Sequence, residues 1–145
     1  MKKIILILVL SAMAVTALAQ ENKTPEQREK EFFEAIEKQV EKLTEMLNLD
    51  DWQVFYVDSI LTHDFKALQD ELESLSKAKV SNSDLFYASQ DKWMEQMYQS
   101  LNKVFDEEQW GKYLKSGALR DKKARDKRAA KAAGVEAKAK AAKKK

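Results

Sequence analysis

The segment from Asp50 to Lys77 reads DDWQVFYVDSILTHDFKALQDELESLSK and carries the clearest structural signal in this chain of 145 residues. Its large apolar side chains recur at intervals of three or four residues: Val54, Val57, Leu61, Phe65, Leu68, Leu72 and Leu75. Because an α-helix completes a turn in 3.6 residues, this spacing places all of them on one face. Asp50 can cap the first turn of such a helix. The segment therefore predicts a long amphipathic helix with one face in a core.

The regions on either side show the same helical periodicity. The tetrapeptide Thr24-Pro25-Glu26-Gln27 is typical of a helix start, because it has a cap residue, a proline at the first helical position and a glutamine three residues after the cap. The apolar residues expected on the inner faces of the other helices are Phe33, Ile36, Val40, Leu43, Leu47, Phe86, Trp93, Met94, Met97, Leu101, Val104, Phe105, Trp110, Tyr113 and Leu114.

The fold class predicted from these patterns is all-α. The chain contains one proline and three glycines, so little in it interrupts helices. Four amphipathic helices are expected, with the spans Pro25–Asn48, Asp51–Lys77, Asp84–Phe105 and Glu107–Ser116. Gly117 is expected to end or loosen the fourth. Because the connections are short, neighbouring helices should be antiparallel, which gives an elongated helical hairpin or bundle.

The N-terminus has the pattern of a secretory signal peptide. A basic head at residues 1–3 precedes the apolar run Ile4–Leu10, and Ala17-Leu18-Ala19 forms a small-x-small cleavage site before Gln20. We therefore expect residues 1–19 to be removed between Ala19 and Gln20, and the protein to be exported to the periplasm. The apolar run is short for a membrane span. The chain has no cysteine, which excludes disulfide bonds and a lipid carried on a cysteine at the cleavage site.

Charge divides the mature chain into an acidic body and a basic tail. Residues 20–119 hold 12 basic and 21 acidic side chains, whereas residues 120–145 hold 12 basic and 3 acidic ones. The tail is rich in alanine and lysine, and it is expected to be disordered or marginally helical because it has no apolar face to bury. Two interpretations stay open: a segment that binds an anionic envelope surface, or a solubility tail. No nucleic-acid partner is expected, because the tail lacks aromatic residues for base stacking.

A short motif occurs twice. Leu49-Asp50-Asp51-Trp52-Gln53 and Phe105-Asp106-Glu107-Glu108-Gln109 each contain a large apolar residue, an aspartate, two variable residues and a glutamine, and they lie 56 residues apart. Each is a capping box: the aspartate can accept from the backbone N–H three residues on, and the glutamine can accept from the backbone of the aspartate. The apolar residue before the cap can pack against the helix. The motif residues are therefore expected to have a structural role.

The two boxes, in an exported and cysteine-free helical chain, resemble the paired L-T-x-x-Q motifs of the Spy/CpxP family. Asp50 and Asp106 stand where that family usually has threonine, and Phe105 stands where it usually has leucine. The resemblance spans Pro25 to Leu119 and leaves the basic tail outside. It implies long helices that form an antiparallel, cradle-shaped homodimer. It also implies an ATP-independent periplasmic chaperone or an inhibitor of an envelope-stress sensor kinase.

Six aromatic and methionine residues are candidates for a client-binding surface. Trp52, Phe55 and Tyr56 lie outside the main apolar stripe of their helix, and Trp93, Met97 and Tyr98 widen the stripe of the next helix. One interpretation is packing in the core or in a dimer interface, which is the usual role of aromatic residues at helical spacing. The other is binding of unfolded chains, because aromatic and methionine side chains adapt to many partners.

Metal binding and catalysis have little support in the sequence. His63 is the single histidine and has only Asp64 beside it, so a solvent-facing histidine is expected, with no metal site and no cofactor. A branch of helical hairpins related to the Spy/CpxP family senses heavy metals, and the lone histidine argues against that role for this chain. There is no glycine-rich phosphate loop, nucleophile elbow or cysteine nucleophile, and we expect no enzymatic activity.

Two functional hypotheses of different classes follow. The first is a chaperone that binds unfolded or partly folded envelope proteins without ATP. The second is a regulatory or structural binding protein that docks on a stress sensor or on the envelope surface. A homodimer is expected in both cases, because three amphipathic helices with additional aromatics carry more apolar surface than one thin protomer covers. The basic tails are expected to project from this dimer and to be dispensable for pairing.

Overall fold

The computed structural model describes residues 23–142, so the predicted signal peptide and its cleavage site at Ala19 and Gln20 lie outside the described part of the chain. The described residues form helices and no strand, which confirms the all-α prediction. The elements are α2 (Pro25–Leu47), α3 (Asp51–Lys77), α4 (Ser83–Val104), α5 (Glu107–Tyr113), a π-helical turn η2 (Leu114–Ala118) and α6 (Leu119–Ala142). The predicted ends of α2, α3 and α4 differ from the observed ends by at most one residue.

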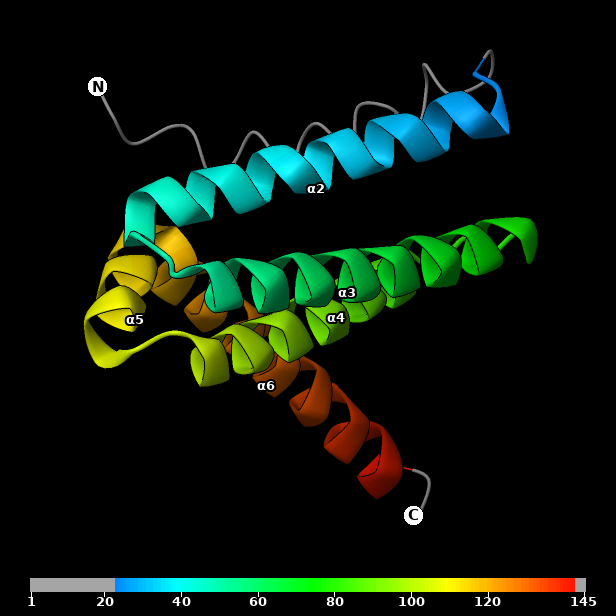
Figure 1. Cartoon of the computed structure of the whole chain (residues 1–145). Helices are drawn as coiled ribbons and strands as arrows, with labels where there is room; N and C mark the ends of the chain where they lie inside the picture. Colours follow the sequence, from blue (N-terminus) through cyan, green and yellow to red (C-terminus); the bar gives the residue numbers. More distant parts are fainter. Residues whose placement is uncertain (1–22, 143–145) are drawn as a thin grey trace, which may run out of the picture.

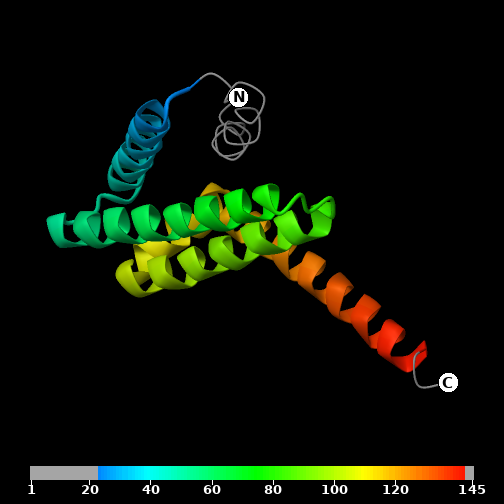
Figure 2. The same cartoon turned by 90° about the vertical axis from the view of Figure 1, so that its right-hand side faces the viewer.

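The architecture is an antiparallel hairpin of α3 and α4 with helices on its outside (Figure 1). The α2–α3 and α4–α5 connections lie at the same end of this hairpin. The view in Figure 2 shows that α2 rises away from the hairpin toward its own N-terminus, and that α6 leaves the body in a different direction. None of the helices within residues 23–142 is both long and apolar enough to cross a membrane.

The core is a single apolar cluster between α2, α3 and α4, and it consists largely of the predicted stripes. Its buried members are Ile36, Val40, Leu43, Leu47, Leu49, Val57, Leu61, Phe65, Leu68, Met97, Leu101 and Phe105. Phe33 is an exception, because it was expected on the inner face and is about half exposed. Phe32, four residues before Ile36, packs against the cluster instead, and Phe33 lies about 100° further around the helix.

The basic tail differs from expectation in its first turns. It continues as α6, and Arg125 is buried with 9% of its surface exposed. The Arg125 guanidinium donates to Glu95 on α4 at 3.1 Å, and that of Arg128 makes two hydrogen bonds of 2.6 Å with the Asp91 carboxylate. The expectation that the tail has no face to bury is therefore wrong for these turns. The reason is that α6 docks through arginine–carboxylate pairs, which an apolar pattern does not reveal.

A kink at Gly117 sets the direction of α6. Gly117 has φ 127° and ψ −15°, which lies in the left-handed half of backbone space that side chains with a Cβ disfavour. The helical path is therefore interrupted between α5 and α6, as the expected loosening at Gly117 implies. The change in direction brings Arg125 and Arg128 over α4.

We predict that Gly117→Ala lowers the free energy of unfolding by about 1–2 kcal/mol, because alanine is strained at this φ. Gly111 provides the matched control, since it is helical and a Cβ there would meet nothing within 4 Å. Gly111→Ala should raise stability by up to about 1 kcal/mol through helix propensity. Urea denaturation followed by circular dichroism measures both. Equal effects of the two substitutions would contradict the assignment of the kink to Gly117.

Candidate functional site

The two capping boxes meet through their glutamines. Gln53 and Gln109 are both buried, with 3% and 7% of their surfaces exposed. The Gln53 Nε2 donates to Gln109 Oε1 at 2.7 Å, and Gln109 Nε2 donates back to Gln53 Oε1 at 3.0 Å. A side-chain amide has one donor group and one acceptor oxygen, so this arrangement joins two identical groups reciprocally. The repeated motif is thus one structural unit made from two distant segments.

Each glutamine also completes its own box. Gln53 Oε1 accepts from the Asp50 backbone N–H, and Gln109 Oε1 accepts from that of Asp106, each at 3.0 Å. The Asp106 carboxylate accepts from the Gln109 backbone N–H at 2.8 Å, whereas Asp50 makes no equally well-formed side-chain hydrogen bond. The Gln53 Nε2 additionally donates to the carbonyl of Val104 at the end of α4. These contacts support the predicted structural role of the boxes.

The apolar residues that precede the two caps are both buried. Leu49 and Phe105 belong to the core cluster between α2, α3 and α4. Each follows the end of one helix and comes directly before the cap of the next, so their burial anchors both connections. The predicted packing of these two residues beside the capping boxes agrees with their positions.

The structure divides the six candidate client-binding residues into two groups. Trp52, Phe55 and Tyr56 on α3 expose 54%, 69% and 52% of their surfaces. The Tyr56 ring is in edge-to-face contact with both others, at centroid distances of 6.2 Å to Trp52 and 5.6 Å to Phe55. We call these three residues the aromatic patch. It offers a contiguous apolar surface within two helical turns.

The other group lies inside the fold. Met97 exposes only 4% of its surface and belongs to the core cluster, and Trp93 is half-buried against that cluster. Tyr98 is in edge contact with Trp110 at a centroid distance of 4.8 Å, and the Arg125 guanidinium lies 5.5 Å from the centre of the Tyr98 ring. For Trp93, Met97 and Tyr98 the packing interpretation therefore accounts for their positions, and a client surface on α4 is not supported.

An open groove of about 500 Å³ lies beside the aromatic patch. It runs between α2 and α3, and Phe55 contributes to both the groove and the patch. Val40 and Val54 are the other apolar residues in it, and the remaining lining residues are the carboxylates Glu37, Glu41, Asp51 and Asp58. We call these four residues the groove carboxylates. None of them takes part in an ion pair with another residue of the described chain.

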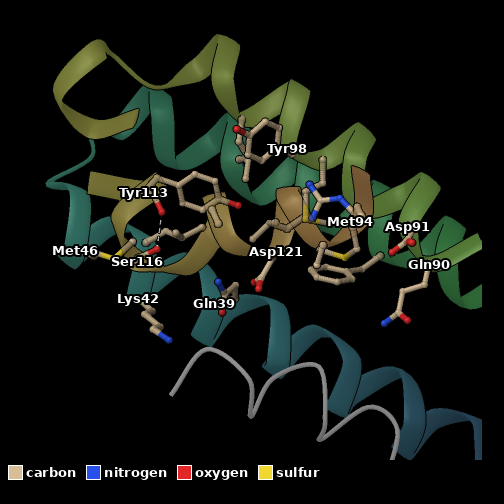
Figure 3. A pocket seen from close by; sticks show the side chains of 18 of the residues that line it. Gln39, Lys42, Met46, Gln90, Asp91, Met94, Tyr98, Tyr113, Ser116 and Asp121 are labelled. Atoms are coloured by element: carbon tan, nitrogen blue, oxygen red, sulfur yellow. Dashed lines mark hydrogen bonds between the residues drawn. The ribbon is translucent and has the colours of Figure 1, made fainter. Parts of the chain in front are cut away.

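A second hollow, with a volume of about 310 Å³, lies where α2, α4 and α6 come together. Figure 3 shows Met46, Met94, Tyr98 and Asp121 among the side chains around it. Burial raises the pKa of Tyr113, another lining residue, to about 12, so its phenol stays neutral at physiological pH. This hollow could not be predicted from the sequence, because its wall on α6 depends on the kink at Gly117.

Glu71 connects the far part of the hairpin. Its carboxylate accepts from Lys92 Nζ at 2.8 Å, Trp93 Nε1 at 2.6 Å and Ser89 Oγ at 2.8 Å, all on α4. These donors, Lys92 first, lower the pKa of Glu71 from 4.5 to about 2. The indole of Trp93 is therefore held by a carboxylate across the hairpin, which gives its polar end a structural role.

His63 is exposed, as expected, while its neighbour Asp64 is buried. The His63 Nδ1 lies 2.8 Å from Asp64 Oδ1, and the same oxygen accepts from Gln96 Nε2 at 2.9 Å. Within residues 23–142, no group of three or more histidine, cysteine, aspartate or glutamate side chains is arranged to hold a metal ion. The polar contacts of Asp64 join α3 to α4.

The chain matches no protein-family model, no curated protein and no solved structure. Three features of the described residues bear on function: the aromatic patch, the groove beside it, and the basic helix α6.

We predict that Gln53→Ala lowers the free energy of unfolding by about 2–4 kcal/mol, because it leaves the buried Gln109 Nε2 without its acceptor and the Val104 carbonyl without its donor. A double-mutant cycle with Gln109→Ala should give a coupling energy of about 1–3 kcal/mol. Gln69→Ala, at an exposed position of α3, is the control and should change stability by less than about 0.5 kcal/mol. Additive effects of the Gln53 and Gln109 substitutions would contradict the reciprocal pairing.

We also predict a pH-dependent contribution from Glu71. Its lowered pKa means that the stabilisation is fully present above about pH 4.5 and is lost as the pH falls toward 2. Glu71→Gln should therefore be less stable than the parent by about 1–2 kcal/mol at pH 7, a value discounted because the side chain is one-third exposed. This difference should shrink steadily between pH 5 and pH 2.5 in chemical denaturation. Glu45→Gln, at an exposed position of α2, is the control, and its effect on stability should not depend on pH. A pH-independent effect of Glu71→Gln would contradict the prediction.

Proposed function

We propose that this chain is an exported, ATP-independent chaperone-like protein that binds unfolded or partly folded envelope proteins. The observation that carries the proposal is the aromatic patch of Trp52, Phe55 and Tyr56, three large side chains that are at least half exposed and lie next to one another. Soluble proteins seldom expose contiguous apolar surface without a binding role.

The composition of this surface favours loose binding of varied partners. The aromatic rings offer large area at a small loss of conformational entropy, and the tyrosine and tryptophan can form hydrogen bonds at their polar ends. The groove carboxylates place negative charge beside the aromatic patch, and this charge helps to keep a protein with such an exposed patch in solution. Such a surface suits weak contacts with unfolded segments better than a single rigid ligand.

The resemblance to the Spy/CpxP family adds to the proposal. It rests on the two capping boxes at Asp50 and Asp106, in an all-helical chain with a predicted signal peptide. Members of that family are periplasmic chaperones or inhibitors of a stress sensor, and they form antiparallel dimers. We extend the periplasmic location and the homodimer to this chain as part of the proposal.

A regulatory or structural envelope protein is the second candidate. The observation that favours it is α6, whose described side chains beyond Arg128 are exposed and which is strongly basic. A basic helix of this kind is attracted to anionic lipid headgroups. In this case the protein would bind one defined partner or surface and would not protect unrelated clients.

We predict that the protein suppresses aggregation of several unrelated denatured proteins without ATP, at near-stoichiometric ratios. The variant Trp52→Gln with Phe55→Gln and Tyr56→Gln should lose most of this activity, at least about fivefold, because the apolar contact area is removed. Leu85→Gln with Tyr87→Gln is the matched control, since both residues are similarly exposed on α4, and it should keep full activity.

Circular dichroism of all variants separates loss of binding from loss of folding. An aromatic-patch variant that folds and still protects clients fully would refute the assignment of the site. If the parent protein protects no client and instead captures a single envelope partner, the regulatory or structural candidate replaces the chaperone.

A further inference from the structure

The charges of α6 fall into two sets. The first set is satisfied within the protomer: Arg125 pairs with Glu95, and Arg128 pairs with Asp91. Lys127 lies between these two arginines and Lys131 follows them, and both lysines are exposed and make no ion pair with another residue of the described chain. Residues 129–145 contain six lysines and one glutamate, so the end of the chain carries a large excess of positive charge.

The groove carboxylates are the complementary unpaired set. Glu37 and Glu41 lie four residues apart on α2, so the helical repeat places them on one face, and both are exposed. Asp51 and Asp58 line the groove from α3. The apolar floor of Val40, Val54 and Phe55 lies among these carboxylates. The groove therefore offers negative charge around an apolar strip that a helix could cover.

The spacing of the carboxylates on α2 matches that of a docking site which the protein already uses on α4. On α4, Asp91 and Glu95 are four residues apart, and they hold cations presented by α6. Glu37 and Glu41 have the same spacing on α2, and Lys127 and Lys131 have it on α6. The same helix-on-helix ion pairing can thus be repeated with unpaired groups.

These contacts cannot form within one protomer. The part of α6 beyond Arg128 extends away from α2 and α3 in both views (Figures 1 and 2). Residues 129–142 form about 20 Å of helix at 1.5 Å per residue, which exceeds the roughly 10 Å between Asp51 and Asp58 along α3. The projecting helix is therefore long enough to cover the groove of another molecule.

We propose that the exposed part of α6, from Lys127 onward, docks in the groove between α2 and α3 of a second copy of this chain. Lysines of the tail, led by Lys127 and Lys131, pair with the groove carboxylates, and the alanine-rich helix surface covers Phe55. Two such contacts related by a twofold axis form a closed dimer. The dimer interface therefore includes the basic tail. This differs from the expectation from the sequence, in which the tails project freely and are dispensable for pairing.

The proposal goes beyond client binding, and it has a consequence for that function. Because Phe55 belongs to both the groove and the aromatic patch, tail docking covers part of the client surface. The two activities are tested separately, since self-association is measured without any client. A protein that fails to protect clients can still dimerise in this way.

Reciprocal charge reversal in the full mature chain tests the interface. The groove variant carries Glu37→Lys and Glu41→Lys, and the tail variant carries Lys127→Glu and Lys131→Glu. In sedimentation velocity at about 50 mM salt, each variant alone should self-associate at least about tenfold more weakly than the parent, because like charges face each other. An equimolar mixture should recover parental affinity within about threefold, because one contact of the mixed dimer joins the reversed groove to the reversed tail and the other joins an unaltered groove to an unaltered tail.

The recovery in the mixture also shows that both variants are folded. Glu29→Lys with Glu45→Lys changes the net charge equally at exposed α2 positions outside the groove, and it should associate like the parent. Parental self-association of either test variant, or a mixture that stays monomeric, would overturn the proposal. The tail variant is also tested on anionic phosphatidylglycerol vesicles. If it self-associates like the parent but no longer binds these vesicles, the tail is assigned to the envelope surface and the dimer proposal is overturned.

Discussion

The reciprocal hydrogen bonds between Gln53 and Gln109 constrain the rest of the structure. Two helices that begin 56 residues apart share one buried amide pair, so their first turns can occupy only one relative position. An unpaired amide in this place would carry a large desolvation penalty, which makes alternative positions of α5 unfavourable. Because the pair holds α5 against α3, it also positions the chain that leads into the kink at Gly117 and on to α6. The core and the basic helix are thus connected through this polar contact as well as through the arginine–carboxylate pairs on α4.

The molecule uses different interactions at its two kinds of helix contact. The packing of α2, α3 and α4 depends on a continuous apolar cluster, which is largely insensitive to salt. The docking of α6 on α4 depends on Arg125 and Arg128 with their carboxylate partners, with Tyr98 beneath one guanidinium. Ion pairs near the surface weaken as salt rises, so α6 is the element whose attachment responds to ionic conditions. The unpaired charges that follow on the same helix are available to another molecule.

The distribution of aromatic residues follows from the same geometry. Trp93 and Tyr98 lie on α4 where α3, α5 and α6 surround it, so they become part of the packing. Trp52, Phe55 and Tyr56 lie at the start of α3 on the side that α4 does not cover, and they remain accessible. Residues of the same chemical type therefore have different roles because of the direction in which each helix face points.

The sequence by itself determined the local structure of this protein. Helix formation, the caps at Thr24, Asp50 and Asp106, the buried stripe of α3 and the exposure of His63 all depend on residues within a few turns of one another. Only the tertiary structure decided which aromatic residues are exposed, that Gln53 pairs with Gln109, and that the start of the basic tail packs on α4. These contacts join residues 30 to 56 positions apart, and they depend on helix rotation and crossing. Periodicity does not contain this information, because it states which side of a helix is apolar and not which helix will cover it.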